Sequence, residues 1–237
     1  NLLFWYFRWP KLDKLLGGVD VFFMPNIMFG SVSRNCKLIL TMHDLSFERY
    51  PKTFSWKRRL WHALINSKKL CQRADKIIAV SQSTKDDLVT LYKIAPEKIQ
   101  VIYSAVSNAF CVIDRNDERL IKAKEKYNLP FKFILYLGTI EPRKNIVAIV
   151  RAYNHFQEYA RKYNLEEFAK YKLVIAGEEG WLSGKIFSEI EKSEFKDHIQ
   201  VIHFVEDEDK SCVYNLASLF VYPSFFEGFG FPPLEAM

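Results

Sequence analysis

Short apolar runs, separated by more polar stretches, recur along the whole chain. A continuous apolar run of four to eight residues is typical of a strand that is buried on both faces of a sheet. Runs of this kind, each predicted as a strand, cover residues 37–42, 76–80, 99–103, 133–137, 172–176, 199–204 and 219–222. Strands that alternate with helices indicate a parallel sheet with helices on its faces. The pattern therefore predicts an α/β protein with doubly wound parallel sheets.

Helical periodicity fills the intervals between these strands. A helix is predicted from Ser55, with one face formed by Trp56, Leu60, Ala63, Leu64 and Ser67. Its basic residues Lys57, Arg58, Lys68 and Lys69 lie elsewhere on the helix. Ser83 and Asp86 resemble a capping box in which Asp replaces Glu, and they predict a helix from Ser83 through Tyr92. Further helices are predicted over residues 146–163, 184–194 and 210–217, the first with Ile146, Ile149, Val150, Tyr153 and Phe156 on one face.

The composition changes to charged and polar residues between Asp114 and Asn128. The alternation of strands and helices restarts after this stretch, so we place the domain boundary there. We predict an N-terminal domain over residues 1–113, a linker over 114–131 and a C-terminal domain over 132–237. No internal sequence repeat links the two halves.

Composition and charge narrow the class of protein. With 237 residues, 49% of them hydrophobic and 16% aromatic, the chain can bury one large core or two modest ones, which excludes intrinsic disorder. A formal net charge of +6 favours anionic partners, namely nucleotides, phospholipid headgroups or nucleic acid. The aromatic residues fall in core-like runs and do not alternate with Lys and Arg, so nucleic acid is the least favoured of the three. Four cysteines, spread singly, argue against zinc and a disulfide scaffold and fit a reduced, cytoplasmic setting.

The sequence at the two ends of the chain leads to two further predictions. The aromatic run Asn1 to Trp9 is too short to span a bilayer, and we predict a helix packed on the domain in preference to a membrane anchor. The chain begins at Asn1 and stops two residues after Glu235, so we expect it to be a fragment cut at both ends.

A glycine-rich loop follows the last predicted strand and is the strongest candidate for a ligand site. It holds two carboxylates, Glu227 and Glu235, with Gly228 and Gly230 between them and a Pro pair suited to the first turn of a helix. A loop that leaves the carboxyl end of a strand and enters a helix is where open α/β sheets bind phosphate-bearing ligands. Carboxylates there would accept hydrogen bonds from the hydroxyls of a sugar and a ribose. Taken alone, Glu235 in a first helical turn equally fits a favourable interaction with the helix dipole.

Arg143 and Lys144 lie between a predicted strand and a predicted helix. Backbone N–H groups and the helix dipole favour an anion at that place, so two cations there would clamp a diphosphate. The alternative is a solvated pair of side chains, but the start of a helix is electrostatically unfavourable for cations, and we favour the anion site.

Two polar sites remain ambiguous. His43 and Asp44 directly follow a predicted strand, which favours a functional His over a structural one. Asp207, Glu208 and Asp209 resemble the Asp-x-Asp metal clamp of some sugar transferases, but they immediately precede a helix, and we interpret them as acidic capping residues. No metal site is predicted.

Several nucleotide-binding and hydrolytic motifs are absent from the sequence. It contains no Gly-x-x-x-x-Gly-Lys-Ser/Thr loop, which argues against a P-loop ATPase. Pro233 stands where a dinucleotide fingerprint would need its third glycine, and no Gly-x-Ser-x-Gly elbow occurs.

The segment from Tyr222 to Met237, with its two glutamates separated by seven residues, resembles the signature of glycosyltransferase family 4. Supporting segments are residues 138–145, similar to the diphosphate loop of the family, residues 78–81, and residues 41–47. The resemblance implies a GT-B architecture, in which two Rossmann-like domains, both incomplete in this chain, face a cleft. It also implies retention of anomeric configuration and a nucleoside-diphosphate sugar as donor, with no cofactor and no metal.

The resemblance also implies roles for single residues. Arg143 and Lys144 would neutralise the departing diphosphate, with Gly138 in the same donor-binding loop. Glu235 would hold the ribose hydroxyls. Glu227 would hold the donor sugar with the backbone amides of Phe229 and Gly230. His43 would contact the transferred sugar, and Val205 is a weaker candidate for the pocket of the nucleotide base.

The acceptor and the location are less defined. Residues 43–47 look most like those of mannosyl-type transferases that act on polysaccharide or lipid-linked acceptors, so mannose is a candidate sugar and polysaccharide biosynthesis a candidate process. The basic helix of residues 56–69 suits the anionic inner face of a membrane, although a solvated helix face fits equally well. The glycine-rich loop near the N-terminus of the family has no counterpart in this chain, and we expect the 237 residues alone to be inactive. A GT-B sugar-nucleotide epimerase or hydrolase and a non-catalytic nucleotide-sugar binding module remain as alternatives.

Overall fold

The computed structural model describes residues 9–237, which form two compact units. Of the described residues, the first unit comprises 9–105 together with Glu227–Phe229, and the second comprises Val106–Phe226 and Gly230–Met237. The prediction of a helix over the opening aromatic run concerns residues that lie, apart from Trp9, outside the described part of the chain.

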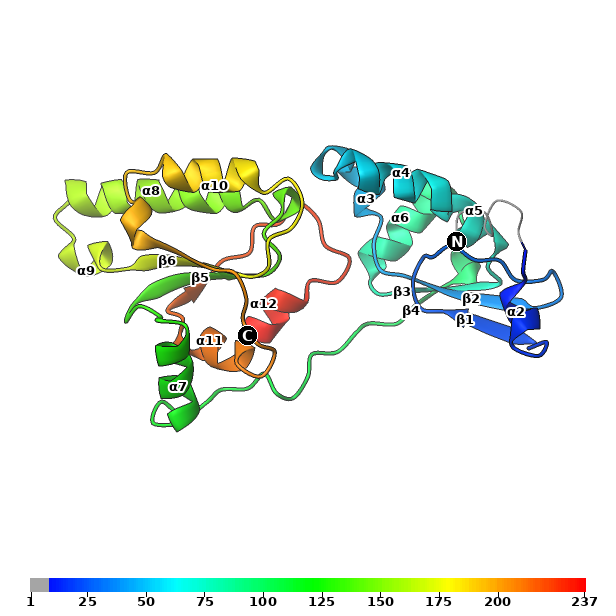
Figure 1. The fold of residues 1–237 in the computed structure, drawn as a ribbon, viewed down its shortest axis with the longest axis horizontal. Helices are drawn as coiled ribbons and strands as arrows, with labels where there is room; N and C mark the ends of the chain where they lie inside the picture. The colour runs from blue at the N-terminus through cyan, green and yellow to red at the C-terminus, as the bar shows by residue number, and fades with distance from the viewer. Residues whose placement is uncertain (1–8) are drawn as a thin grey trace. The chain divides into compact units, whose positions relative to one another are not determined.

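The first unit contains a parallel sheet whose strands follow chain order, β1-β2-β3-β4 (Figure 1). The strands are β1 (Val21–Met24), β2 (Lys37–Met42), β3 (Lys76–Ala79) and β4 (Ile99–Val101). The helices are α2 (Leu12–Leu15), α3 (Ser46–Arg49), α4 (Trp56–Ile65), α5 (Ser67–Arg73) and α6 (Gln82–Tyr92), with single 3-10 turns η1 (Pro51–Thr53) and η2 (Pro96–Lys98). Leu40, Ile77 and Leu88 are fully buried between sheet and helices, so the predicted apolar strands form the core.

The second unit contains a parallel sheet in the order β7-β6-β5-β8. Its strands are β5 (Phe133–Leu137), β6 (Lys172–Ala176), β7 (Ile199–Ile202) and β8 (Leu219–Phe220). Its helices are α7 (Glu118–Lys126), α8 (Ile146–Lys162), α9 (Glu166–Ala169), α10 (Gly184–Glu191), α11 (Lys210–Leu216) and α12 (Phe231–Ala236), with 3-10 turns η3 (Pro142–Lys144) and η4 (Lys196–His198). Helices α8 and α10 cover one face of the sheet, and α7 and α11 lie on the other (Figure 1). The doubly wound α/β fold predicted from the sequence is confirmed.

Strand boundaries agree best with the prediction where the strand is central and buried. β2, β5 and β6 begin and end at the predicted residues, whereas β3 is one residue shorter than predicted and β4, β7 and β8 are two residues shorter. β1 was not predicted although its four residues, Val21–Met24, form a short apolar run; this edge strand is mostly exposed, and only Met24 is buried. The predicted buried face of α8 is confirmed, with Ile146, Ile149, Val150 and Tyr153 in the core.

Two details of the predicted helices were wrong. The N-cap of α6 is Ser81 and not Ser83, since the Ser81 hydroxyl accepts a hydrogen bond from the backbone N–H of Thr84 at 3.1 Å. Asp86 is no capping residue, because its carboxylate accepts a hydrogen bond from the side chain of Gln82 at 2.8 Å.

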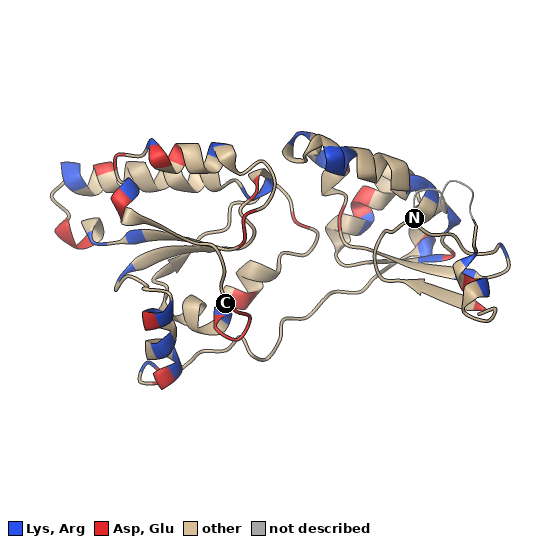
Figure 2. Cartoon of the chain, in the orientation of Figure 1, with Lys and Arg blue, Asp and Glu red and all other residues tan. Residues whose placement is uncertain are grey.

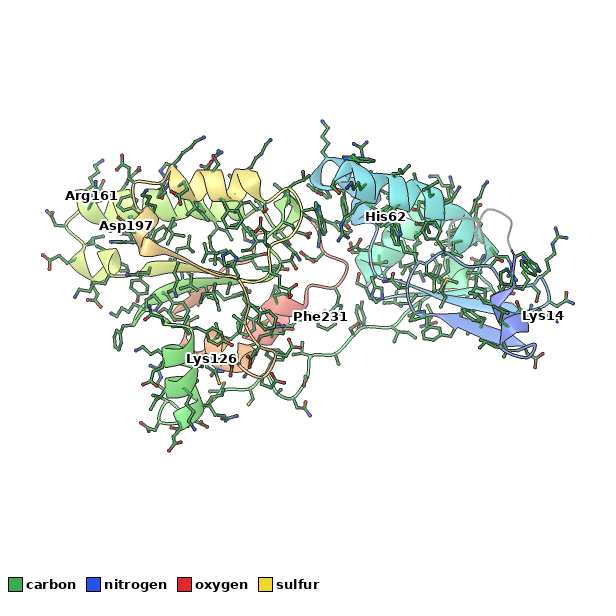
Figure 3. The ribbon with its side chains drawn as sticks, viewed as in Figure 1. Lys14, His62, Lys126, Arg161, Asp197 and Phe231 are labelled. Atoms are coloured by element: carbon green, nitrogen blue, oxygen red, sulfur yellow. The ribbon has the colours of Figure 1, made fainter. Side chains whose placement is uncertain are left out.

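The stretch predicted as a linker, residues 114–131, contains helix α7. This helix packs on α11 through Leu120, Ala123 and Cys212. Lys126, labelled in Figure 3, donates to the carboxylates of Glu206 and Asp209, both at 2.7 Å. These contacts make α7 part of the second unit.

Residues 9–237 were searched for membrane-spanning helices, metal sites and disulfide bonds. None of the helices over this range is long and apolar enough to cross a membrane. No group of three or more His, Cys, Asp and Glu side chains in this range is arranged to hold a metal ion. The four cysteines are free thiols, and burial raises the pKa of Cys71 to about 12.

Candidate functional site

In the second sheet, the direction in which successive strands are added reverses at β5. From β5 the chain adds β6 and then β7 on one side, and it then returns to place β8 on the other side of β5. In an open parallel sheet such a reversal leaves a crevice at the carboxyl ends of the two neighbouring strands, because their connections leave in opposite directions. The two loops singled out in the sequence, residues 138–145 after β5 and residues 221–230 after β8, therefore begin at this switch point.

The loop after β5 is fixed by backbone contacts with the loop after β6. The N–H of Ile140 donates to the carbonyl of Glu178 at 2.8 Å, and the N–H of Gly180 donates to the carbonyl of Ile140 at 3.0 Å. The loops approach so closely that a Cβ atom on Gly177 would lie 2.0 Å from the carbonyl oxygen of Gly138. Both glycines have a positive φ, 152° at Gly138 and 142° at Gly177. Glycine is therefore required here for close backbone approach and for backbone conformation.

Arg143 lies in η3, and its side chain joins the two loops of the switch point. Its Nη1 donates to the carbonyl of Phe226 at 2.6 Å, and its backbone carbonyl accepts from the N–H of Phe225 at 2.9 Å. Its Nη2 donates to Glu141 at 2.8 Å, and Glu141 is itself 2% exposed. A guanidinium held by two oxygens from separate segments has a defined orientation, which is what bidentate recognition of a phosphate needs.

Lys144 is 8% exposed, which is unusual for a lysine. Its ammonium group donates to the hydroxyl of Tyr222 at 2.5 Å and lies 5.0 Å from the centre of the same ring. Tyr222 in turn stacks on Tyr136 of β5, with ring centres 5.7 Å apart. The first residues of α8 follow directly after Asn145. Two cations thus lie beside the N-terminus of a 17-residue helix, where an anion would also be favoured by the helix dipole.

The predicted donor-binding residues of the glycine-rich loop are divided between the two units. Gly230, with φ 88°, is the N-cap of α12 and belongs to the second unit. Glu227, Gly228 and Phe229 are grouped with the first unit, in which the ring of Phe229 lies 6.4 Å from that of Tyr103. The assignment of Glu227 and of the Phe229 amide to a donor sugar stays a prediction.

Glu235 differs from its predicted setting. It is the fifth residue of α12 and not part of the first turn, so the interpretation as a dipole partner was wrong. Its Oε2 accepts a hydrogen bond from the hydroxyl of Tyr214 at 2.9 Å. Burial, together with the neighbouring Glu235 carboxylate, raises the pKa of Tyr214, so the hydroxyl remains a donor. The structure thus gives Glu235 a fixed orientation, and its role toward a ribose stays a prediction.

Val205 and the acidic cluster follow β7. Val205 is buried, and its side chain packs in a core cluster with Leu137 and Val213. Only its backbone can therefore meet a base without a change in the core. Asp209 precedes α11 but forms no side-chain cap, so the capping interpretation was wrong for this residue. Its carboxylate accepts from Lys126 and from the hydroxyl of Tyr127, both at 2.7 Å, and the Lys126 hydrogen bond holds the pKa of Asp209 below its usual value.

His43 follows β2 in the first unit, as predicted, and is exposed. Its Nε2 lies 3.0 Å from the carbonyl oxygen of Pro25, which follows β1. Asp44 does not act on the imidazole, since its Oδ1 accepts from the backbone N–H and the hydroxyl of Ser46 at 2.8 and 2.6 Å. His43 is therefore held at the carboxyl edge of the first sheet.

Sequence reasoning missed the partners of the predicted site residues. Glu141, Tyr222 and Thr84 each bond a residue that had been predicted, namely Arg143, Lys144 and His43. Glu141 stands two positions from Arg143, and an acidic residue that close to a candidate anion-binding cation is a usable signal. Tyr222 and Thr84 lie 78 and 41 positions from their partners, and no local pattern marks them.

Two protein-family models together match nearly the whole chain. The model described as Glycosyl transferases group 1 matches residues 117–237, and that described as Glycosyltransferase Family 4 matches residues 1–110. The chain is 39% identical to Serotype-specific mannosyltransferase WbdA of Escherichia coli over 168 residues, which are 70% of this chain and 20% of that protein. It is 31% identical to O-antigen chain mannosyltransferase B of Escherichia coli over 207 residues, which are 85% of this chain and 50% of that protein. The chain thus spans between a fifth and a half of the length of these relatives.

Solved structures support the fold. WaaG, described as a glycosyltransferase involved in lipopolysaccharide biosynthesis, matches with a TM-score of 0.68 at 16% identity over 98% of this chain and 60% of its own. HepE of Anabaena in complex with UDP-glucose matches with a TM-score of 0.63 at 15% identity over 95% of this chain and 59% of its own. At such identities the similarity concerns the fold alone, which is that of the GT-B glycosyltransferases. Because a family model covers each half and the curated relatives share extended sequence similarity, this chain belongs to glycosyltransferase family 4, the glycosyl transferases group 1.

Proposed function

We propose that the protein to which this chain belongs is a retaining glycosyltransferase that moves a sugar from a nucleoside diphosphate to a glycan or lipid-linked acceptor. The observation that carries this proposal is the pair of cations at the switch point, Arg143 oriented by Glu141 and Phe226 and the buried Lys144. Neither is a typical solvated surface side chain. Mannose is the proposed sugar, because the relatives described above are named mannosyltransferases.

The proposed chemistry follows from where charge develops. Breaking the anomeric C–O bond leaves an oxocarbenium-like sugar and a diphosphate that gains negative charge, so stabilisation of that leaving group is the largest catalytic contribution. Arg143, Lys144 and the start of α8 supply this stabilisation without a metal. Glu235 would bind the ribose, and Glu227 with the amides of Phe229 and Gly230 would bind the sugar. Attack from the face of the leaving group, with the phosphate accepting the acceptor proton, would give retention.

A binding and product assay on the full-length protein tests the proposal. We expect nucleoside diphosphates and their sugars to raise the melting temperature, because a ligand that binds only the native state stabilises it. Lys144→Ala should abolish the shift, whereas Lys162→Ala, at the far end of α8, should leave it unchanged. Donor turnover to free sugar or an isomer without any acceptor would support the hydrolase or epimerase alternative. A melting shift without any turnover would support a binding module.

We further propose that α4 contacts an anionic membrane. Trp56 is 69% exposed and Leu60 is 51% exposed on a helix that also carries Lys57, Arg58 and Arg59 (Figure 2). Exposed Trp and Leu side chains beside Lys and Arg are typical of helices that lie at the interface of an anionic bilayer. Of the predicted apolar face, Trp56, Leu60 and Ala63 are thus exposed, whereas Leu64 is half-buried and Ser67 is buried.

Flotation of the full-length protein with vesicles tests the membrane proposal. We expect binding to vesicles that contain anionic lipid and about tenfold weaker binding after Trp56→Ser combined with Leu60→Ser. Phe131→Ser removes a comparably exposed aromatic side chain from the second unit and should have no effect. Equal binding of the double variant would remove α4 from the interface.

A further inference from the structure

The ring of His43 is held in one tautomer by its contact with Pro25. The Nε2 atom lies 3.0 Å from the carbonyl oxygen of Pro25, and a carbonyl can only accept a hydrogen bond. Nε2 must therefore carry the proton. In the neutral ring Nδ1 is then an acceptor, and no hydrogen bond to Nδ1 occurs among residues 9–237.

The backbone of His43 is held from a second direction by α6. The hydroxyl of Thr84 donates to the carbonyl of His43 at 3.1 Å. Thr84 is completely buried, and its own oxygen accepts a hydrogen bond from the hydroxyl of Ser81 at 3.2 Å. Ser81 is in turn fixed as the N-cap of α6 by the backbone N–H of Thr84. The hydroxyl of Thr84 therefore has a defined direction, toward His43.

The two contacts come from different strands of the sheet. Pro25 follows β1, His43 follows β2, and Ser81 and Thr84 follow β3. His43 is thus held at both its ring and its backbone, by the connections on either side of its own strand. An exposed His with a purely structural role would not require both its ring and its backbone to be fixed in this way.

We propose that Thr84 is a positioning residue, which holds the His43 backbone so that the ring, anchored on Pro25, presents Nδ1 as an acceptor for a hydroxyl group of the bound sugar. The part that concerns the sugar rests on the proposed function. His43 then orients the substrate as a hydrogen-bond acceptor and does not deliver a proton. A Thr side chain is suited to the task because its hydroxyl donates to His43 while it accepts from Ser81.

Substitution of Thr84 in the full-length protein tests the proposal. Thr84→Val keeps the volume of the side chain and removes the donor, and we expect about a tenfold loss in kcat/KM. Thr84→Ser keeps the hydroxyl and should restore most of that loss. Thr90→Val is the matched control on the same helix, where the hydroxyl donates to the carbonyl of Asp86 at 2.7 Å, and it should leave kcat/KM unchanged. If Thr84→Val does not fold, Thr84→Ala, which has no misplaced methyl group, takes its place.

The tautomer is measured separately from turnover. A two-bond proton–nitrogen correlation spectrum of the protein labelled with ¹⁵N-histidine should show His43 protonated at Nε2, with its resonances displaced in Thr84→Val and not in Thr90→Val. An Nδ1-protonated ring, or equal losses of kcat/KM in Thr84→Val and Thr84→Ser, would overturn the proposal. If the spectra are as expected but His43→Ala has normal turnover, the positioning is confirmed and the contact of His43 with the sugar is wrong.

Discussion

Within residues 9–237 the two sheets contain the same number of parallel strands, and they differ in how the chain orders them. In the first sheet the described strands follow chain order, and the carboxyl edge carries His43, held by its neighbouring connections. In the second sheet the order reverses at β5, and two loops begin on either side of the reversal. Arg143 and Lys144 bond across these two loops. The same alternation of strands and helices thus positions a His side chain in one unit and a pair of cations that joins two loops in the other.

The largest effect should come from removing a cation at the switch point. We expect Arg143→Ala in the full-length protein to lower turnover by about 100-fold or more, because one preorganised charge donor contributes that much. The measurement is turnover at saturating donor. Arg151→Ala is the matched control, since Arg151 lies on the following helix and pairs with Glu189 on the surface. Near-normal turnover of Arg143→Ala would show that Arg143 does not stabilise the leaving diphosphate.

The next effect concerns the glycines of the two units. Gly177→Ala should lower the free energy of unfolding by about 3 kcal/mol, because its Cβ would meet the Gly138 carbonyl and its φ is unfavourable for alanine. Gly30→Ala in the first unit should lower it by less than about 1 kcal/mol, because its Cβ would meet only the end of the Leu12 side chain. Urea denaturation of both variants gives the difference. Equal losses would show that the second unit does not depend on close packing of its loops.

A smaller effect depends on pH and belongs to the first unit. His62 of α4, labelled in Figure 3, stacks on Phe47 with ring centres 4.0 Å apart. Its Nδ1 is buried with no hydrogen-bond partner among the described residues. Burial lowers the pKa of His62 to about 4 from an ordinary 6.5. The unfolded chain therefore binds the proton first, and the stability that His62 contributes is present above pH 6.5 and is lost as the pH falls to 4.

Denaturation at a series of pH values measures this contribution. We expect a loss of about 2 kcal/mol between pH 6.5 and pH 4, since the ring is only partly buried. His62→Phe keeps the stacking and should flatten this part of the pH profile. A profile unchanged by the substitution would assign the loss to the carboxylates of the chain instead.

The smallest effect concerns the hydrogen bond that orients Glu235. Tyr214→Phe removes the hydroxyl from Glu235 and should lower the free energy of unfolding by about 1 kcal/mol. If Glu235 binds ribose, the same variant should raise KM for the donor with little change in kcat. Tyr159→Phe alters an exposed tyrosine of the same unit and should change neither quantity.

The parts of the fold that were predictable are those where burial alone decides the structure. β2, β5 and β6 are central strands buried on both faces, and their apolar runs end where the strands end. β1 is a four-residue apolar run at an edge of the sheet, and so short a run does not by itself distinguish a strand from other apolar segments. The N-cap of α6 was misplaced by two residues because Ser81 and Ser83 both fit a cap, and only the position of β3 decides between them.

The site was predictable to the extent that charge and chain position define it. Arg143 and Lys144 could be identified because cations at the start of a helix are out of place unless something anionic binds there. Their fixation by Phe226 and Tyr222 could not, because those contacts exist only once β8 has paired with β5. Glu235 was placed in the wrong helical turn because the start of α12 depends on the conformation of Gly230.

The backbone bonds between the loops after β5 and β6 also bear on the thermodynamics of ligand association. Because Gly138 and Ile140 are already bonded to Ala176 and Glu178, these loops lose little conformational entropy when a ligand arrives. The heat-capacity change of diphosphate binding should then be small, since no segment of this part folds on association. Titration calorimetry at several temperatures would register this as an association enthalpy that hardly varies with temperature.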